Sequence, residues 1–357
     1  MRRCAEEEIG KNSVRPCTIP KIIASKIPTR PSLNRVHPRS WVRLWDMKHT
    51  FLGASGLRMS HLGLGTLTWG RDTDIDDANK MVAALLDHGG TTIDISPVYG
   101  DGLAAQVLGS VFDGGVDRSE IVVVAHAGEF YHDDGVRFNG GLGALTASLH
   151  TTLAELRTTY VDVLQVAAPD PRIAIEEQLD CLAQMVRSGA ARYIGLANHP
   201  AWRVARAAQY LKDHHLPALS AIGTEYSVLQ RRPAGDLTAV AREYGLGIIA
   251  QAPLAGGVLT GKYRHTIPAT SRAATEHLSA TVDPYLEDKP RRMVEAVVKA
   301  ADGLGRTPAD VSLAWLLNQP QVTTALIGAR TYAQFEQVLS LEIEPLPTPV
   351  AQAISEI

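Results

Sequence analysis

After Met47, short apolar runs alternate with stretches whose apolar residues recur at helical spacing. The apolar runs lack the polar–apolar alternation of a half-exposed strand, and this is typical of parallel strands buried on both faces. The pattern predicts strands at 62–66, 91–95, 120–124, 162–166, 193–196, 221–225, 247–250 and 324–327. It predicts the helices that follow them at 76–88, 103–112, 142–157, 175–188, 201–212, 237–244, 289–304 and 332–339.

This order of elements predicts an α/β fold with a parallel sheet, either doubly wound or closed into a barrel. The count of eight strand–helix units favours the (β/α)8 TIM barrel. An N-terminal β-hairpin of residues 49–52 and 57–60 precedes it. An additional helix at 309–317 separates the last two units, with Thr307 as a predicted N-cap and Pro308 in the first turn.

Residues 1–46 have a different character. They hold ten Lys or Arg, four acidic residues and five prolines, a net charge of +6, so the other 311 residues carry −9. Without a periodic apolar face, this arm is predicted to be disordered. Three explanations stay open: a targeting arm, against which the acidic run 6–8 argues; a basic tail for an acidic partner; and a mis-called start, with Met47 as the true one. Residues 47–357 are then a single barrel.

The composition excludes several classes of protein. With 45% apolar residues and a net charge of −3, the chain is neither fully disordered nor a typical nucleic-acid binder. No uncharged apolar run reaches the roughly 18 residues of a membrane span. Three cysteines, of which Cys181 is expected to be a packed thiol, are too few for a disulfide scaffold. We therefore expect a cytoplasmic protein with a small-molecule partner, no nucleic-acid or membrane partner, and an oligomeric state that stays open.

In such a barrel, reactive side chains lie where strands end. Asp94 lies at the end of the second predicted strand, Tyr99 follows that strand, and His126 ends the third. A tyrosine at this place can donate a proton if a nearby positive charge lowers its pKa. The alternative is structural: an aspartate that caps a loop, a tyrosine packed on the rim and a hydrogen-bonded histidine.

The last predicted strand ends in a pattern that suits an anion. Gly328 precedes a predicted helix N-terminus, and Arg330 can bind a phosphate group through two nitrogens. The loop 253–257 is a weaker candidate for wrapping a ligand. The sequence contains no Rossmann fingerprint, P-loop, HExxH motif or metal-ligand cluster.

Six segments together resemble the aldo/keto reductases, in particular the branch of potassium-channel β subunits and related bacterial reductases. They occur in family order over nearly all of 49–340, as GLGT at 63–66, IDISPVYG at 93–100, GLAN at 195–198, EYS at 225–227, APLAGGVLTGKY at 252–263 and IGAR at 327–330. The resemblance implies a (β/α)8 barrel that binds NADP(H) across the strand ends and transfers hydride to a carbonyl.

The family uses an Asp–Tyr–Lys–His tetrad. Asp94 and Tyr99 match its first two members, whereas His126 stands at the lysine position and Ala167 at the histidine position. The resemblance therefore assigns catalysis to Asp94, Tyr99 and His126, with a reworked site. Removing one electrostatic donor of this kind typically costs about 10²–10³ in rate.

The resemblance also assigns the cofactor contacts. These residues are Gly65, Thr66, Asn198, Gln251, Pro253, Leu254, Gly256, Lys262, Gly328, Arg330 and Gln334. Four positions depart from the family pattern: Ala197 and Gly223 replace polar contacts to the nicotinamide amide, Gln251 replaces its stacking residue, and Val338 replaces a later Asn.

Three hypotheses of function stay open. The first is an NADP(H)-dependent reductase in which a protonated His126, paired with Asp94, replaces the lysine. The second is an NADP(H)-binding sensor or partner subunit without efficient reduction. The third is a non-redox lyase that uses Glu129, His132 or Asp133. The segments 129–141 and 264–289 are predicted to be long polar loops over the site, and they identify no substrate.

Overall fold

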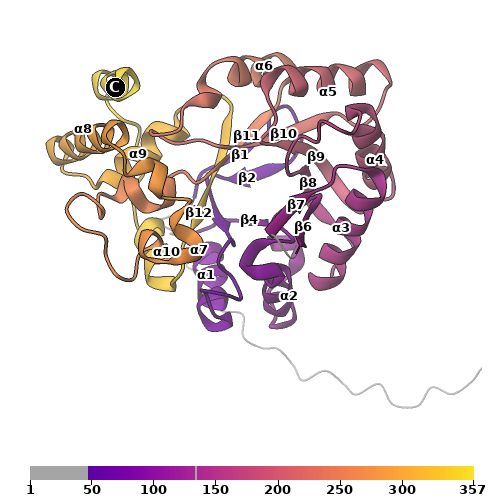
Figure 1. The fold of residues 1–357 in the computed structure, drawn as a ribbon, viewed down its shortest axis with the longest axis horizontal. Coiled ribbons are helices and arrows are strands. Elements are labelled where there is room, and N and C mark those ends of the chain that lie inside the picture. The colour runs from indigo at the N-terminus through magenta and orange to yellow at the C-terminus, as the bar shows by residue number, and fades with distance from the viewer. Residues whose placement is uncertain (1–46, 133–134) are drawn as a thin grey trace, which may run out of the picture. The chain divides into compact units, whose positions relative to one another are not determined.

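Eight parallel strands close into a barrel in the computed structural model, which describes residues 47–132 and 135–357 (Figure 1). Pairing of β9 with β10 and of β12 with β3 completes the circle. The strands are β3 (Leu62–Gly65), β4 (Thr92–Ile95), β5 (Val122–Ala127), β8 (Val161–Val166), β9 (Ala191–Ala197), β10 (Leu219–Glu225), β11 (Gly247–Gln251) and β12 (Val322–Gly328). The predicted (β/α)8 barrel is confirmed.

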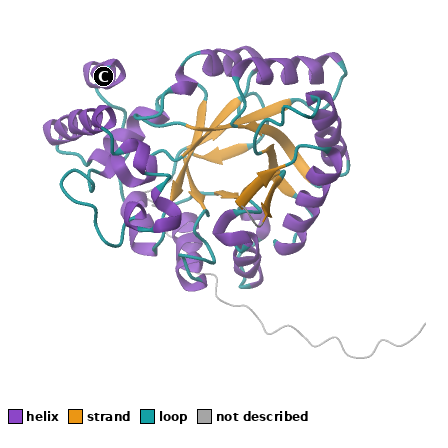
Figure 2. Cartoon of the chain, viewed as in Figure 1, coloured by secondary structure: helices purple, strands orange, loops and turns teal. Residues whose placement is uncertain are grey.

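Helices surround the strands on the outside (Figure 2). They are α1 (Ile75–Asp87), α2 (Ala104–Asp113), α3 (Leu142–Glu155), α4 (Ile175–Arg187), α5 (Ala201–Asp213), α6 (Asp236–Tyr244), α8 (Asp288–Leu304) and α10 (Tyr332–Leu339). The additional helix α9 (Pro308–Leu317) is present, and its N-cap is Thr307, whose hydroxyl accepts from the Asp310 amide. The α1 helix buries one apolar face through Met81 and Leu85, whereas α9 is buried along most of its length.

The N-terminal hairpin closes the end of the barrel at which the strands begin. It consists of β1 (His49–Phe51) and β2 (Arg58–Ser60), as predicted. Leu52 and Met59 are fully buried there. They pack in one cluster with Val124, Val163, Ala221, Ile249 and Leu326. A ligand therefore has to approach from the opposite end, where the strands finish.

Two predictions of local structure were wrong, and one helix was missed. The strand expected at 120–124 runs instead over Val122–Ala127, so His126 lies within it. The segment expected as a loop after it contains a hairpin of β6 (Glu129–His132) and β7 (Gly135–Phe138). A C-terminal helix, α11 (Thr348–Glu356), was not predicted and packs beside α8 (Figure 1).

The α11 helix is anchored by side chains that a sequence pattern does not pair. Its Ile354 is buried, and the Trp315 indole N–H donates to Ser355 Oγ over 2.9 Å. Cys181 is buried and unpaired, as predicted. No helix in residues 47–132 and 135–357 is long and apolar enough to cross a membrane. The predicted basic arm, 1–46, falls outside the described residues.

Candidate active site

Asp94 and His126 meet at the end of the barrel where the strands finish. They lie on the neighbouring parallel strands β4 and β5, whose register pairs Asp94 with Val124, so His126 stands one inward-facing position further along. His126 Nε2 lies 2.9 Å from Asp94 Oδ1, and the two side chains are 4% and 3% exposed. The imidazole N–H therefore donates to a buried carboxylate.

This contact favours the protonated form of His126. Burial, the largest influence, acts to lower the pKa of the imidazole because it disfavours the charged form. The charge and hydrogen bond of Asp94, together with the charge of Glu129, outweigh burial and raise the pKa of His126 above its ordinary value. The site thus holds a cation at this position more readily than a free histidine would.

Tyr99 is the third residue that the structure brings to this place. Its ring centroid lies 6.2 Å from that of His126, with the two rings tilted by 48°. It begins the short 3-10 helix η1 (Tyr99–Gly102), in which Gly100 has a φ of +57°. A Cβ at Gly100 would lie 1.6 Å from the Trp69 carbonyl oxygen, so this turn needs glycine to place the tyrosine.

Tyr99 keeps its proton more firmly than an ordinary tyrosine. Burial and the charges of Asp94 and Glu129 raise the pKa of Tyr99 well above its usual value. The sequence-based condition for an acid catalyst, a lowered tyrosine pKa, is therefore absent. The phenol is a neutral hydrogen-bond donor, and positive charge on His126 is what could make it a better acid in a reaction.

Glu129 and Gln251 join this cluster. Glu129 follows β5 through Gly128, whose φ of +93° turns the chain, and its Oε2 accepts from Ser96 Oγ over 2.5 Å. The amide nitrogen of Gln251 lies 3.5 Å from His126 Nε2. The resemblance assigned Gln251 to the cofactor, whereas the structure places it against the histidine. Ser96 was not predicted, although its place two residues after Asp94 is a signal that could have suggested it.

A buried amide lies one layer deeper in the barrel. Gln165 pairs with His126 in the β5–β8 register, is fully buried, and has no hydrogen-bond partner for either amide atom among the described residues. A Cβ at Gly223 would lie 2.1 Å from Gln165 Oε1. Gln165 therefore fills the space that the glycine leaves. Ala167, in the next inward position, is buried and supplies no side-chain donor.

Asn198 and Thr66 lie on two sides of the barrel end. Asn198 adopts a left-handed conformation with φ +58°, is exposed, and donates from Nδ2 to the Ala167 carbonyl over 3.1 Å. Thr66 is buried and donates to the Asp94 carbonyl over 2.8 Å. Gly65 and Gly328 are partners in the β12–β3 register, which leaves a strand end without side chains between the two.

The loop after β11 bends through residues in the left-handed conformation. These are Ala252, Ala255, Gly256 and Gly257. A Cβ at Gly256 would lie 2.9 Å from Val282 Cγ2. Pro253 is buried and Leu254 is half-buried against the core, so both support the loop from beneath. The 3-10 helix η4 (Ala255–Thr260) then leads to Lys262.

Lys262, Arg272 and Arg330 form a cluster of cations beyond this loop. Arg272 donates from Nη2 to the Gly328 carbonyl over 3.0 Å, and Arg330 donates from Nη1 to Thr275 Oγ1 over 3.1 Å. None of the three cations forms an ion pair with a described residue. Burial and the charge of Arg330 lower the pKa of Arg272, and burial and the two arginines lower the pKa of Lys262.

This excess of positive charge suits an anion. The hydroxyl of Ser271, next to Arg272 in the chain, is buried and has no hydrogen-bond partner among the described residues. Gln334 accepts from the Arg330 amide through Oε1 over 3.0 Å and so fixes the start of α10. Arg272 and Ser271 were not predicted, because they lie in a segment without periodicity or motif.

The residues proposed for a lyase are only partly brought together. Glu129 lies at the site, His132 is exposed at the end of β6, and Asp133 lies outside the described residues. Within the parts of the chain that the structure describes, no group of three His, Cys, Asp or Glu side chains is placed to hold a metal ion.

Residues 61–357 match the model described as "Aldo/keto reductase family". The chain belongs to the aldo/keto reductase family. The Bacillus subtilis protein "Uncharacterized oxidoreductase YrpG" is 30% identical over 320 residues, 87% of this chain and 96% of that protein. A rice protein (Oryza sativa subsp. japonica) named "Probable voltage-gated potassium channel subunit beta" is 31% identical over 309 residues, which are 85% of this chain and 94% of that protein.

A third relative, "Protein tas" of Escherichia coli, is 28% identical over 327 residues, 84% of this chain and 94% of that protein. The predicted resemblance to the potassium-channel β subunits and bacterial oxidoreductases is thus confirmed. Membership identifies this aldo/keto reductase as an oxidoreductase of a family that generally uses NAD(P)H.

Proposed function

We propose that this aldo/keto reductase is an NADP(H)-dependent reductase of carbonyl compounds in which His126, held by Asp94, acts in place of the family's lysine. The observation that carries the proposal is the 2.9 Å contact between His126 Nε2 and Asp94 Oδ1 beside the Tyr99 ring. It gives the site a buried cation next to a phenol, and these are the two features that carbonyl reduction requires of the protein.

The described residues fit NADP(H) at its phosphate end. Lys262, Arg272 and Arg330 present positive charge and form no ion pair with a described carboxylate, and the buried hydroxyl of Ser271 has no hydrogen-bond partner among the described residues. An additional phosphate is the feature that separates NADP(H) from NAD(H), so this cluster favours NADP(H). When bound, the cofactor supplies the hydride for the carbonyl carbon.

At the nicotinamide end, the protein offers fewer contacts. Asn198 keeps an exposed amide, and Gln251 borders His126. Gly65 and Gly328 leave the paired ends of β3 and β12 free of side chains, and Gly256 keeps the β11 loop bent. These residues would line the path of an extended dinucleotide between the catalytic cluster and the cations.

Each catalytic side chain has a distinct role. Tyr99 donates its phenolic proton to the carbonyl oxygen as negative charge develops there. The His126 imidazolium stabilises that charge and offsets the raised pKa of the phenol. Asp94 keeps His126 oriented and protonated. Ala167 supplies no second donor to the oxygen, so we expect slower turnover than a full tetrad would give.

A second candidate follows from Ala167 and Gln251. Without a donor at Ala167, and with Gln251 against His126 instead of a stacking ring, the protein could bind NADP(H) and turn it over poorly. It would then serve as a cofactor sensor or a partner subunit. Binding and turnover have to be measured separately to distinguish the two.

The test combines NADPH fluorescence titration with turnover of a panel of aldehydes and ketones. Tight binding with turnover that falls about 10²-fold or more in Tyr99→Phe supports the reductase. The matched control is Tyr210→Phe, since Tyr210 donates to Asp180 on the outer helices and should leave turnover unchanged. Binding without turnover favours the sensor. Failure to bind NADPH overturns both.

A further inference from the structure

A segment between η4 and α8 contributes Arg272 to the cation cluster and accepts a hydrogen bond from Arg330 through Thr275. We call residues 264–287 the strap; it contains the 3-10 helices η5 (Arg272–Ala274) and η6 (Asp283–Tyr285) and the short helix α7 (Glu276–Ser279). The strap is fastened at one point by the Tyr285 hydroxyl, which donates to Glu225 at the end of β10. At a second point, His277 Nε2 lies 3.0 Å from Asp72 Oδ1.

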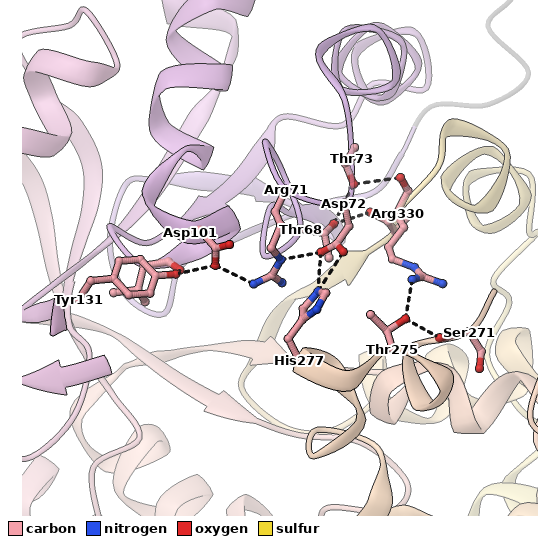
Figure 3. A network of polar contacts seen from close by, with 12 residues as sticks. Thr68, Arg71, Asp72, Thr73, Asp101, Tyr131, Ser271, Thr275, His277 and Arg330 are labelled. Atoms are coloured by element: carbon pink, nitrogen blue, oxygen red, sulfur yellow. Dashed lines mark hydrogen bonds and ion pairs between the residues drawn. The ribbon is translucent and has the colours of Figure 1, made fainter. Parts of the chain in front are cut away.

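Asp72 belongs to a loop after β3 that the chain holds firmly. The amides of Asp72 and Thr73 both donate to the Thr68 carbonyl, over 2.9 and 3.0 Å. Thr73 Oγ1 donates to the Arg330 carbonyl over 2.9 Å. The backbone of this loop is therefore held in place, while its Asp72 side chain contacts the strap through His277 (Figure 3).

Arg71 connects Asp72 to the loop that carries Tyr99. Its Nε donates to Asp72 Oδ2 over 2.9 Å, and its Nη1 donates to Asp101 Oδ1 over 2.8 Å. Figure 3 shows the guanidinium between the two carboxylates, with His277 on the far side of Asp72. A planar guanidinium with fixed donor directions couples the positions of its two partners more tightly than a flexible ammonium would.

Asp101 depends on such contacts for its conformation. We call residues 98–103 the Tyr99 loop; within it Gly100, Asp101 and Gly102 all have positive φ, which is unfavourable for the aspartate. Asp101 also accepts from the Tyr131 hydroxyl of β6 over 3.2 Å. The Tyr131 hydroxyl and the Arg71 guanidinium thus both hold the Tyr99 loop through the Asp101 carboxylate.

We propose that Arg71 is a positioning residue that transmits the closure of the strap, through Asp72 and Asp101, to the Tyr99 loop. The catalytic consequence rests on the proposed function: the acid Tyr99 is placed for reaction only while the strap is fastened over the phosphate end of the cofactor. A single exposed ion pair contributes little stability. Asp72 and Arg71, however, each bind two partners, so a change at one partner affects the contact with the other.

Hydrogen exchange of the full chain without cofactor or substrate tests the relay. His277→Gln should accelerate amide exchange in peptides covering the strap and, through Arg71, in those covering the Tyr99 loop by about threefold or more. In an Arg71→Met background, His277→Gln should still affect the strap but no longer the Tyr99 loop. An effect confined to the strap in the wild-type background, or one that persists in the Arg71→Met background, would overturn the relay.

Matched variants separate the relay from general loosening. Arg206→Met removes a surface pair of similar length, 2.6 Å to Glu176, and should leave both segments unchanged. Arg71→Lys keeps the charge but not the two-pronged geometry, so it should restore coupling only in part. If His277→Gln still accelerates exchange in the Tyr99 loop to the full extent in the Arg71→Lys background, the geometry of the guanidinium does not link the two segments. Because exchange needs neither NADPH nor turnover, failure of the proposed reductase and failure of the relay are distinguishable.

Kinetics then measures the catalytic consequence. If the protein reduces carbonyls, Arg71→Met should lower kcat several-fold while changing the KM for the carbonyl little, because Arg71 places the acid and does not contact the substrate. An unchanged kcat with a raised KM for the carbonyl would show that Arg71 has no role in placing Tyr99.

Discussion

His126 Nε2 and Asp94 Oδ1 lie 2.9 Å apart, with both side chains buried at the end of the barrel. A neutral histidine alone could not do the work of a lysine, because it carries no charge at neutral pH. The aspartate changes this, since its charge and hydrogen bond raise the pKa of the imidazole against the opposing effect of burial. In the proposed reductase, this pair takes the place of the family's permanently charged lysine, but only at a pH at which His126 is protonated.

The first prediction concerns that pH dependence. In the proposed mechanism the reactive form has protonated His126, so activity should be full below the raised pKa of His126 and fall as pH rises through it, about tenfold per pH unit at the alkaline end. His126→Lys should move this fall to higher pH, because an amine titrates later. The measurement is kcat/KM across pH 6–10. An unchanged alkaline limb in His126→Lys would show that another group titrates.

The second prediction concerns the choice of cofactor. Lys262→Met and Arg330→Met should each weaken NADPH binding by about tenfold or more and leave NADH binding unchanged, since each removes a charge that only the additional phosphate contacts. Lys299→Met, on α8, is the matched control. Equal losses for NADPH and NADH in the Lys262 or Arg330 variant would show that these cations bind the shared pyrophosphate.

The third prediction concerns a buried carboxylate at the other end of the barrel. Asp162 is 4% exposed and accepts from Arg118 Nη2, the Val123 amide and Arg192 Nη1, over 2.8, 3.0 and 3.1 Å. Asp162→Asn leaves Arg118 without its charge partner and should lower the free energy of unfolding by about 3 kcal/mol or more.

The control for this prediction is Asp113→Asn. Asp113 pairs with Arg157 at the surface, where both side chains are more than half exposed. Its loss should cost less than about 1 kcal/mol in urea unfolding. Similar losses at the two positions would mean that burial does not govern the strength of these pairs.

The fourth prediction concerns Gly223. Its substitution by alanine brings a Cβ within 2.1 Å of Gln165 Oε1 and should destabilise the protein by about 1–3 kcal/mol through overpacking. Gln165→Ala should relieve the clash, so the double variant should be more stable than the sum of the single effects predicts. Thermal unfolding of the four proteins gives the coupling. If the losses of stability in the two single variants simply add in the double variant, the cost of Gly223→Ala does not come from a clash with Gln165.

The regular part of the fold could be predicted because buried strands and amphipathic helices leave periodic patterns. The apolar runs at the eight barrel strands predicted the barrel, and Thr307 predicted the start of α9. The β6–β7 hairpin escaped because its residues are mostly exposed and do not alternate. The α11 helix escaped because its anchor, the Trp315–Ser355 hydrogen bond, joins distant positions.

Part of the site could be predicted because its residues lie at or just after the ends of strands. Asp94 and His126 were named from their places at strand ends and Tyr99 from its place in the loop after a strand, and the structure brings the three together. The contact of His126 with Gln251 joins opposite parts of the chain, so no local pattern contains it. Arg272 and Ser271 lie in the aperiodic strap, and only the fold shows that they join Arg330.

In the proposed function, this protein moves hydride between NADPH and a carbonyl with Tyr99 as the acid. The most direct measurement supplies NADPH deuterated at the transferring carbon together with a reactive aldehyde, and analyses the alcohol product by mass spectrometry. With the wild type we expect deuterium on the carbinol carbon, and with Tyr99→Phe a loss of about 10²-fold or more in its rate of appearance. NADPH that binds without yielding deuterated alcohol, or an equal rate in Tyr99→Phe, would contradict the proposed function.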